Sequence, residues 1–313
     1  MNEIEMLQSV CRQFLIAEEI SVRTLQEGHI NDTFSVRTAE GDFVLQRLQS
    51  KMDPQRLLFN YELYAPVCEA NGFAFPKWRK AADGSYFYTD SDGKRWRMYP
   101  YIEGETLTAP LTEDQFYACG KGLAGLHKML AKLPGKPVAV YPMLHDLPYY
   151  YERYCTLLKD GEVLEESRDS AVEKRISERS KAYTQAADKA VIHGDAKLSN
   201  IIFREGSVVG MLDWDTVMVG SVCEEIADCI RSCAVKGERF DRKGAEALLN
   251  GYQSVSKMSE TALWNIRRAF EKINFELALR YYTDAISKEK VFKEHYPGYR
   301  LMRVRELLQI RWR

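Results

Sequence analysis

An eight-residue segment, His-Gly-Asp-Ala-Lys-Leu-Ser-Asn, occupies positions 193–200 and leads directly into a predicted β-hairpin. Two apolar runs, residues 201–203 and 208–212, are separated by a short turn-forming segment, which is the pattern of two antiparallel strands. A hairpin returns the chain to the place where it began. The pattern therefore predicts that Asn200, at the entry of the first strand, lies beside Asp213, at the exit of the second.

The acidic and amide residues of this segment have the spacing of a phosphoryl-transfer site. Such a site needs a carboxylate that takes the proton of the attacking hydroxyl, and oxygen ligands that hold Mg²⁺ against nucleotide phosphates. In the protein-kinase pattern H-R-D-x-x-x-x-N followed by D-F-G, the first Asp is the base, and the Asn and the second Asp bind metal. Asp195, Asn200 and Asp213 match these positions. One such residue alone most often caps a turn, but the three together favour the catalytic interpretation.

Two differences from the protein-kinase pattern narrow the family. Gly194 stands in place of the Arg, and Trp214-Asp215 stands in place of Phe-Gly. His-Gly-Asp followed by Asp-x-Asp resembles the aminoglycoside phosphotransferase and choline kinase superfamily, whose members phosphorylate small molecules. The resemblance implies an α+β, protein-kinase-like fold, with a nucleotide-binding lobe built on a small antiparallel sheet (residues 1–101) and a mainly helical lobe with the catalytic loop and acceptor site (residues 102–313).

The pattern along the chain agrees with a small sheet in the first lobe. Residues 4–14 have the apolar spacing of a helix, and short strands are predicted at residues 22–25, 31–38 and 43–48. A helix is predicted over residues 55–71.

Beyond this helix, a hairpin is predicted from residues 78–80 and 85–88, followed by a strand over residues 95–101. Residues 162–190 are charged with interspersed apolar residues and indicate a solvated pair of helices. Most of the remainder is expected to be helical.

Several residues of the first lobe are candidates for nucleotide binding. Arg47 ends the third predicted strand, where the V-A-I-K pattern has its phosphate-binding Lys. Choline-kinase-like enzymes place an Arg there, so the resemblance implies the same role, with a surface Arg as the alternative. Glu62 is the candidate partner that orients Arg47, with an ordinary surface Glu as the alternative. Pro100, Tyr101 and Ile102 lie where a hinge would offer backbone groups to adenine; the alternative is an edge strand that ends in a loop.

Residues 28–33, Gly-His-Ile-Asn-Asp-Thr, lie between the first two strands, where a phosphate-covering loop belongs. One Gly makes a weak phosphate cradle by general criteria. The segment closely resembles the corresponding loop of N-acetylhexosamine 1-kinases, which are anomeric sugar kinases, and implies nucleotide contacts for Gly28, His29 and Asn31. Trp214 departs from this family, where an aliphatic residue is expected. Further segments resemble the same family: residues 43–47, 193–200, 212–218, 228–232 and 276–284.

The resemblance and the spacing together suggest a role for each polar residue of the catalytic segment. Asp195 is expected to be the general base, and Asn200 and Asp213 are expected to hold Mg²⁺. Asp215 is a further candidate metal ligand, with acceptance of loop amide hydrogens as the alternative. Lys197 either neutralises the transferred phosphoryl group or pairs with an acid.

The acceptor is less constrained by the sequence. The resemblance implies that Arg280 contacts it; alternatively, Arg280 pairs with Asp284 one helical turn away. Choline requires aromatic residues around a quaternary ammonium, and an aminoglycoside requires an acidic pocket, whereas residues 288–313 are rich in Lys and Arg. A neutral sugar therefore fits better, and the resemblance to N-acetylhexosamine 1-kinases implies phosphorylation by ATP on the anomeric hydroxyl of an N-acetylhexosamine. Choline, homoserine and aminoglycoside acceptors, and a catalytically silent binding protein, are the alternatives.

The composition of the chain indicates which other partners and structural sites are not expected. The 44 basic and 45 acidic residues nearly cancel, so no net charge favours nucleic acid or an anionic membrane. Seven Cys with no C-x-x-C and five His with no metal-ligand spacing indicate neither a disulfide framework nor a zinc site. The absence of a signal-peptide pattern and of long apolar runs leads us to expect a cytoplasmic protein. The oligomeric state is left open.

Overall fold

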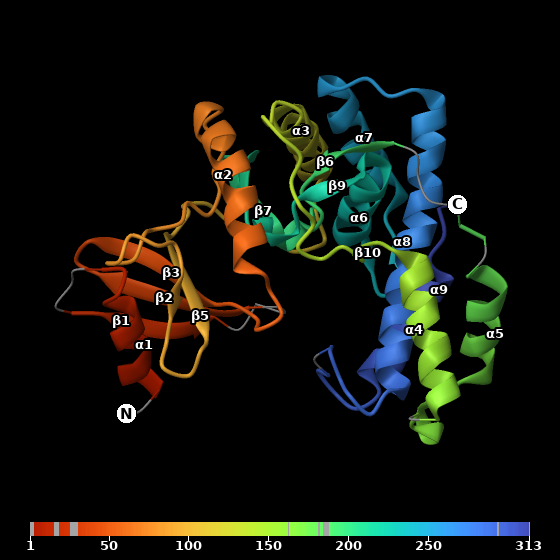
Figure 1. Cartoon of the computed structure of the whole chain (residues 1–313). Helices are drawn as coiled ribbons and strands as arrows, with labels where there is room; N and C mark the ends of the chain where they lie inside the picture. Colours follow the sequence, from red (N-terminus) through yellow and green to blue (C-terminus); the bar gives the residue numbers. More distant parts are fainter. Residues whose placement is uncertain are drawn as a thin grey trace.

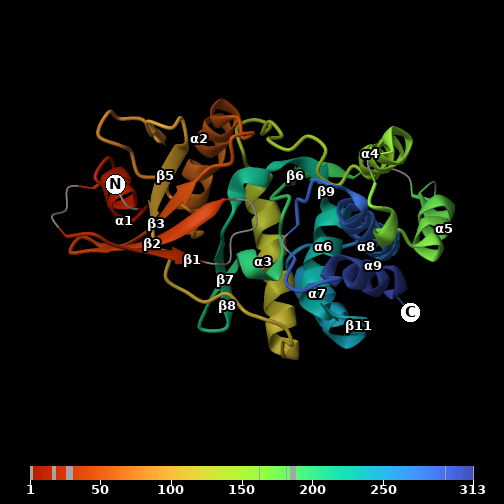
Figure 2. The ribbon, with the colours of Figure 1, turned by 90° about the horizontal axis from the view of Figure 1, so that it is seen from below.

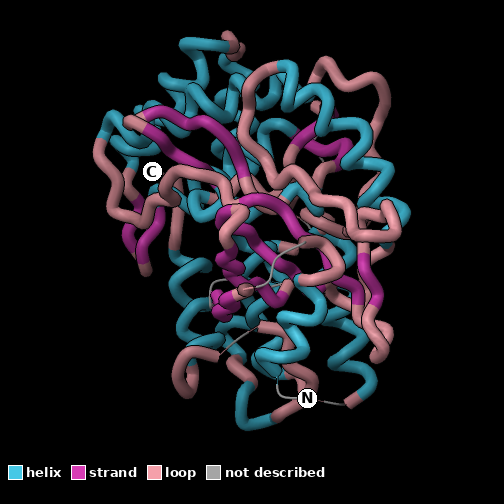
Figure 3. Tube along the Cα trace, turned by 90° about the vertical axis from the view of Figure 1, so that its left-hand side faces the viewer, coloured by secondary structure: helices cyan, strands magenta, loops and turns pink. Residues whose placement is uncertain are grey.

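The computed structural model of the chain has two lobes, one built on a β-sheet and one mainly helical, and confirms the predicted α+β, protein-kinase-like fold (Figure 1). It describes residues 3–15, 19–25, 31–161, 163–180, 182–183, 188–292 and 294–312. Figure 3 looks at the molecule from the side of the sheet lobe and shows most of the helices behind it. None of the helices in these ranges is long and apolar enough to span a membrane.

The N-terminal sheet is antiparallel and follows the order β1-β2-β3-β5-β4. Its strands are β1 (Ser21–Leu25), β2 (Asp32–Thr38), β3 (Gly41–Arg47), β4 (Tyr88–Thr89) and β5 (Arg95–Pro100). The predicted hairpin of residues 78–80 and 85–88 is wrong, because β4 pairs with β5 instead. Residues 79 and 98 form only an isolated bridge.

The two faces of this sheet pack against different parts of the chain. Phe43 and Leu45 of β3 lie in a core cluster with helix α1 (Glu3–Cys11), whereas Val44 lies in a second cluster with helix α2 (Pro54–Ala70) and the C-terminal lobe. This alternation follows from the two-residue period of a strand. It gives the sheet one face toward α1 and one face toward the other lobe.

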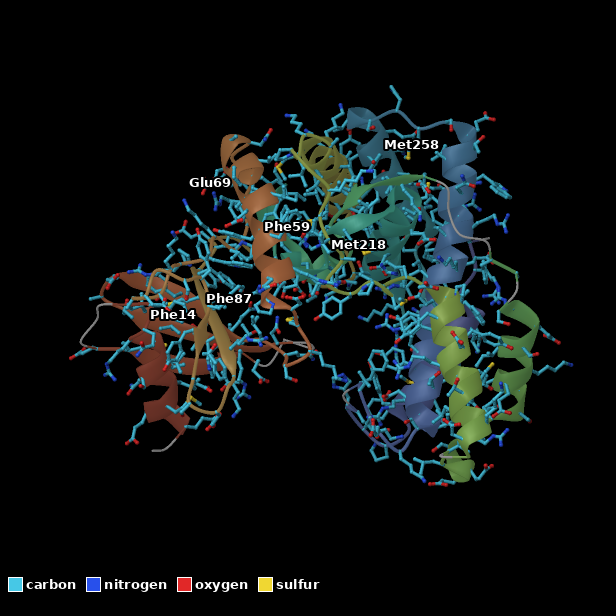
Figure 4. All side chains as sticks on the ribbon, in the orientation of Figure 1. Phe14, Phe59, Glu69, Phe87, Met218 and Met258 are labelled. Carbon is cyan, nitrogen blue, oxygen red and sulfur yellow. The ribbon has the colours of Figure 1, made fainter. Side chains whose placement is uncertain are left out.

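Helix α2 begins where the sequence predicts. Asp53 caps it by accepting hydrogen bonds from the backbone N–H groups of Gln55 and Arg56, and Pro54 occupies the first turn. Asn60 of α2 donates to the carbonyls of Val138 (2.8 Å) and Val217 (3.4 Å). Helix α2 is thereby tied to the C-terminal lobe; its neighbour Phe59 is labelled in Figure 4.

The C-terminal lobe is built around long helices that surround short two-stranded ribbons. Figure 2 shows α3 between the N-terminal sheet and the remaining helices. The helices are α3 (Glu113–Leu130), α4 (Leu147–Asp160), α5 (Ser170–Arg179), α6 (Val222–Ala234), α7 (Arg242–Val255), α8 (Glu260–Ile286) and α9 (Tyr299–Gln309). The ribbons are β6 (Lys189–Ile192) with β9 (Met218–Ser221), β7 (Ile201–Arg204) with β8 (Ser207–Met211), and β10 (Val235–Lys236) with β11 (Arg239–Phe240).

The helix pair predicted over residues 162–190 is only partly correct. The described part of this segment holds a 3₁₀ turn (Glu165–Ser167), helix α5, and the first residues of β6. The prediction was made from charge alone and is wrong at the end of the segment, where the chain enters β6. This strand leads to the loop of residues 193–200.

Candidate active site

The segment 193–200 forms a loop that brings its three polar functional groups together. The Nζ of Lys197 lies 2.6 Å from Oδ2 of Asp195. The Nδ2 of Asn200 donates to the same oxygen (3.1 Å) and to the backbone carbonyl of Asp195 (2.9 Å). Oδ2 is therefore held from two sides, while Oδ1 accepts no hydrogen bond from a described residue.

The predicted hairpin is confirmed by strands β7 and β8. Its ends meet as expected, because the backbone N–H of Leu212 donates to the carbonyl of Asn200 (2.8 Å). Asp213 follows immediately in the left-handed conformation, with φ 58° and ψ 60°, a region where Asp is tolerated better than most residues. The sequence pattern thus places Asp213 beside the loop that carries Asp195.

The carboxylate of Asp213 is close enough to those of Asp195 and Asp215 to interact with them electrostatically. Burial, followed by the charges of Asp215 and Asp195, raises the pKa of Asp213 to about 7. Lys197 is the counter-charge: burial lowers its pKa, but the charges of Asp195 and Asp213 and the hydrogen bond to Asp195 together outweigh burial, so the net shift is upward and the side chain is an ammonium ion. Asp213 and the amide oxygen of Asn200 are hard oxygen ligands of the kind that Mg²⁺ prefers.

Trp214, which stands where N-acetylhexosamine 1-kinases are expected to have an aliphatic residue, is a core residue. It is buried, its ring centroid lies 4.5 Å from that of Tyr64 on α2, and its Nε1 donates to the carbonyl of Met211 (2.9 Å). The indole therefore anchors the turn that carries Asp213 against α2.

Asp215 is placed differently from our prediction. Its two oxygens form a bidentate ion pair with Arg97 of β5, at 2.5 and 2.8 Å, and Oδ2 also accepts from Nδ2 of Asn31 at 3.2 Å. Both carboxylate oxygens are thereby engaged. These contacts argue against Asp215 as a metal ligand and place Asn31 beside the Arg97–Asp215 pair; the predicted contact of Asn31 with the nucleotide stays a prediction.

Arg47 and Glu62 do not form the predicted ion pair. Arg47 instead binds Asp32 across the strands, with Nη2 2.5 Å from Oδ2, and lies over the ring of Trp96. Glu62 is exposed on α2. Arg47 shares the α1 face with Leu45, so its orientation argues against the predicted contact with nucleotide phosphates.

The remaining nucleotide candidates are only partly located. Gly28 and His29 lie outside the described residues. Tyr101 is exposed, and its backbone N–H donates to the carbonyl of Asp42 (2.9 Å), so this N–H is occupied in the present conformation. Pro100 ends β5 and Ile102 follows in the connection to the helical lobe. Their contact with adenine stays a prediction.

Glu225, which holds the loop of residues 193–200 in place, was not predicted from the sequence. Glu225 of α6 is buried and accepts hydrogen bonds from the backbone N–H groups of His193 (3.2 Å) and Gly194 (2.5 Å). Its Oε2 also lies 2.5 Å from Nε2 of His127 on α3, whose Nδ1 lies 2.9 Å from the hydroxyl of Tyr252 on α7. The available signal was a pair of Glu residues in the first turn of a helix that contains many apolar residues.

Close packing behind this anchor fixes the helices that carry it. A Cβ at Gly120 of α3 would lie 1.8 Å from the carbonyl oxygen of Leu248, and one at Gly251 of α7 would lie 2.0 Å from that of Tyr117. Only glycine permits α3 and α7 to approach this closely. The His127–Tyr252 contact depends on that approach.

Replacing Glu225 with Gln is expected to destabilise the chain and to lower turnover. One amide oxygen cannot accept from both backbone donors and His127, and each hydrogen bond to a charged group contributes about 1.5–3 kcal/mol. Thermal unfolding should show a lower Tm than in Glu246→Gln, a control at an exposed site of α7. Equal Tm values would remove Glu225 from this anchoring role.

The effect of Glu225→Gln on the Tm is also expected to depend on pH. Burial raises the pKa of Glu225, but the hydrogen bond and charge of His127, the charge of His193 and the hydrogen bond from the Gly194 amide together outweigh burial, so the net pKa is lowered from 4.5. A carboxylate whose pKa is lower in the folded than in the unfolded state stabilises the fold fully at pH values above its ordinary pKa. That stabilisation is lost as the pH falls through the pKa of the folded state. The Tm difference between wild type and Glu225→Gln should therefore be largest above about pH 4.5 and shrink below it.

Two arginines, Arg231 of α6 and Arg280 of α8, each lie beside an acidic residue. Arg231 is paired with Asp228 (2.8 Å); burial lowers the pKa of its guanidinium, but the charge and hydrogen bond of Asp228, with the charge of Asp195, together outweigh burial, so the net shift is upward. Arg280 lies 3.8 Å from Glu276, with its guanidinium over the ring of Tyr150 (4.9 Å). These groups offer both hydrogen-bond donors and acceptors.

The alternative pairing of Arg280 with Asp284 is wrong. Asp284 instead binds Nε of Arg300 on α9, at 2.6 Å. Arg280 is thus left near Glu276, with nearly a third of its side chain exposed (29%). The position suits a contact with the acceptor, which stays a prediction.

A model of the phosphotransferase enzyme family matches residues 21–258 of the 313-residue chain. The chain belongs to this family. It is therefore a phosphotransferase that acts on the hydroxyl group of a small molecule, as the comparison with the aminoglycoside phosphotransferase and choline kinase superfamily predicted.

Individual relatives support the family assignment. The chain is 25% identical over 285 residues to a homoserine kinase of Phenylobacterium zucineum, covering 88% of this chain and 82% of the relative. It is 25% identical over 271 residues to a homoserine kinase of Gluconobacter oxydans, covering 82% and 80%. These names do not include an N-acetylhexosamine kinase, so the finer resemblance remains a proposal.

Solved structures share the fold. Amicoumacin kinase hAmiN, in complex with AMP-PNP and Ca²⁺, aligns with a TM-score of 0.70 at 13% identity, over 98% of this chain and 92% of that one. A microcompartment-associated aminopropanol kinase aligns with a TM-score of 0.68 at 16% identity, over 98% and 95%. At this identity the likeness concerns the fold alone.

Proposed function

We propose that this phosphotransferase uses ATP with Mg²⁺ to phosphorylate the anomeric hydroxyl of an N-acetylhexosamine. The observation that carries the catalytic part is the position of Asp195, whose Oδ2 is fixed by Lys197 at 2.6 Å and by Asn200 at 3.1 Å. Oδ1 is left to accept the proton of the attacking hydroxyl. Asn200 and Asp213 would hold the metal, which neutralises the phosphate charge as it is transferred.

Each protein group has a separate task in this reaction. Asp195 orients the acceptor hydroxyl and takes its proton as the bond to phosphorus forms, while the bond to the nucleotide oxygen breaks. Lys197 holds the carboxylate and places positive charge near the transferred group. Little covalent chemistry is required of the protein, so positioning and charge neutralisation supply most of the rate.

The acceptor side supports a neutral, hydroxyl-rich substrate. Arg231 is already paired with Asp228, and Arg280 has Glu276 nearby. Charges that are compensated within the protein attract neither an ammonium nor a carboxylate strongly, yet they still provide oriented donors and acceptors. An anomeric hydroxyl is more acidic than an ordinary alcohol, which suits a base of modest strength such as Asp195.

Homoserine is the second candidate acceptor. The homoserine kinase relatives span more than four-fifths of this chain. In addition, the guanidinium of Arg280 is partly exposed and 3.8 Å from Glu276, so an amino-acid carboxylate has access to it.

A direct assay separates the two acceptors. Incubation with ATP, Mg²⁺ and N-acetylglucosamine or N-acetylgalactosamine is expected to yield a sugar 1-phosphate, at a kcat/KM at least about tenfold above that for homoserine, a difference of 1.4 kcal/mol in transition-state binding. Proton–phosphorus correlation NMR identifies the product, because an anomeric phosphate couples to the anomeric proton, whereas a phosphate at another position couples to a different ring proton or to the 6-methylene. Choline and an aminoglycoside complete the panel.

Each outcome has a defined meaning. Phosphorylation at another sugar position, or preferred turnover of homoserine, choline or an aminoglycoside, would reject the anomeric proposal and leave the phosphotransferase assignment intact. Asp195→Asn serves as the blank for contaminating activity.

A further inference from the structure

A single guanidinium joins the N-terminal sheet to the turn that carries Asp213. Arg97 is buried on the face of β5 that points to the C-terminal lobe. Its Nη1 and Nη2 bind the two oxygens of Asp215, at 2.5 and 2.8 Å. Its Nε and Nη2 also donate to Oε1 of Gln46, its cross-strand neighbour on β3, at 2.9 and 2.8 Å.

Aromatic rings hold this guanidinium in place. The Cζ of Arg97 lies 5.1 Å from the ring centroid of Trp78. Trp78 is stacked on Tyr61 of α2, with ring centroids 4.2 Å apart and an angle of 5° between the planes. The stacked rings, together with Gln46, leave the guanidinium a single orientation toward Asp215.

We propose that Arg97 is a positioning residue for the metal site: by holding Asp215 it fixes the turn of residues 213–216, so that Asp213 meets the metal in the correct place. Arg97 contacts neither substrate nor the reacting atoms, and it acts through Asp215. This inference rests on the proposed role of Asp213 as a metal ligand. The cation comes from β5 and holds a carboxylate, whereas the cation predicted at the end of β3 was expected to bind nucleotide phosphate.

The alternation of β3 and β5 explains this exchange. Gln46 and Arg97 are directly opposite each other on the face toward the C-terminal lobe, whereas Arg47 and Trp96 are opposite on the α1 face. A neutral amide therefore occupies the site-facing end of β3 and orients a cation that comes from β5.

The bidentate geometry is what gives the pair its directional effect. A planar guanidinium that meets a carboxylate through two parallel hydrogen bonds fixes the angle as well as the distance, whereas a Lys ammonium fixes only a distance. Asp215 is two residues from Asp213, and Asp213 is in a left-handed conformation. Loss of the pair therefore frees the turn to rotate, and a displacement of about 1 Å at a reacting centre costs on the order of 100-fold in rate.

Arg97→Gln combined with Asp215→Asn tests the proposal. The double variant has no unpaired buried charge, which is the usual cause of unfolding when one partner alone is removed. Binding of AMP-PNP is measured by calorimetry with Mg²⁺ and with EDTA. The affinity with Mg²⁺ is expected to fall at least about tenfold, while the affinity with EDTA changes less than about threefold.

Two further variants sharpen the result. Arg97→Lys keeps the charge and is expected to show the same selective loss, since it cannot bind both oxygens in one plane. Arg37→Gln with Asp42→Asn neutralises an exposed ion pair between β2 and β3 and is expected to bind as wild type does in both conditions.

Wild-type affinity for Mg²⁺·AMP-PNP in the double variant and in Arg97→Lys would overturn the proposal. An equal loss with Mg²⁺ and with EDTA would also overturn it, because a merely structural residue, or a direct phosphate ligand, weakens both. The assay contains no acceptor, so failure to phosphorylate any of the proposed acceptors leaves its result unaffected.

Discussion

Asp195→Asn is expected to lower turnover by about two to four orders of magnitude while nucleotide affinity stays nearly unchanged. The amide cannot take the proton of the acceptor hydroxyl, whereas Asn200 and Asp213, the proposed metal ligands, are left in place. Steady-state kinetics with a saturating acceptor measures kcat, and calorimetry with AMP-PNP measures nucleotide binding.

A matched control for this variant is Asp241→Asn at the N-cap of α7. Asp241 accepts a hydrogen bond from the backbone N–H of Gly244 (2.9 Å), and Asn caps helices about as well as Asp. The control should keep wild-type turnover. If Asp195→Asn retained more than about a tenth of wild-type turnover, Asp195 would not be the general base.

Removing the carboxylate of Asp213 is expected to abolish the contribution of Mg²⁺ to nucleotide binding. Asp213→Ala tests this, but Ala in the left-handed conformation costs roughly 1–2 kcal/mol. Asp213→Asn is the cleaner variant, because Asn tolerates that conformation. Its fold should be no less stable than wild type, since burial and neighbouring carboxylates already disfavour the charge of Asp213.

Calorimetry with AMP-PNP, in Mg²⁺ and in EDTA, measures the effect. Wild type should bind more tightly with Mg²⁺, and both Asp213 variants should bind equally in the two conditions. Undiminished affinity for Mg²⁺·AMP-PNP in Asp213→Asn would require the metal-ligand assignment to be withdrawn.

Local sequence was a sufficient guide to the catalytic loop. The hairpin of β7 and β8 depends on two apolar runs and a tight turn, which are features of adjacent residues. A hairpin also forces its ends together, so the hydrogen bond between Leu212 and Asn200 (2.8 Å) follows from strand pairing alone. For this reason spacing alone predicted that Asp195, Asn200 and Asp213 lie close together, without knowledge of the rest of the fold; their catalytic and metal-binding roles stay predictions.

The structure argues against predicted roles where the role depends on a partner far away in the chain. Arg47 was assigned from its place at the end of a strand, but adjacent strand residues point to opposite faces, and the face that meets the other lobe carries Gln46. Asp215 was assigned from its place after Asp213, but Arg97, 118 residues away, occupies its carboxylate. No local pattern contains that pairing.

The sequence by itself determined the fold class, the family and the order of the catalytic residues, because periodicity, turns and short-range spacing are set within a few residues of each other. Only the tertiary structure decided which charges meet. Burying a charged group costs free energy unless an opposite charge or a hydrogen-bond donor contacts it. For this reason Glu225 holds the loop of residues 193–200, and Arg97 pairs with Asp215. Which group contacts a buried charge is settled by the packing of helices and sheet, since that packing brings together residues that are distant in the sequence.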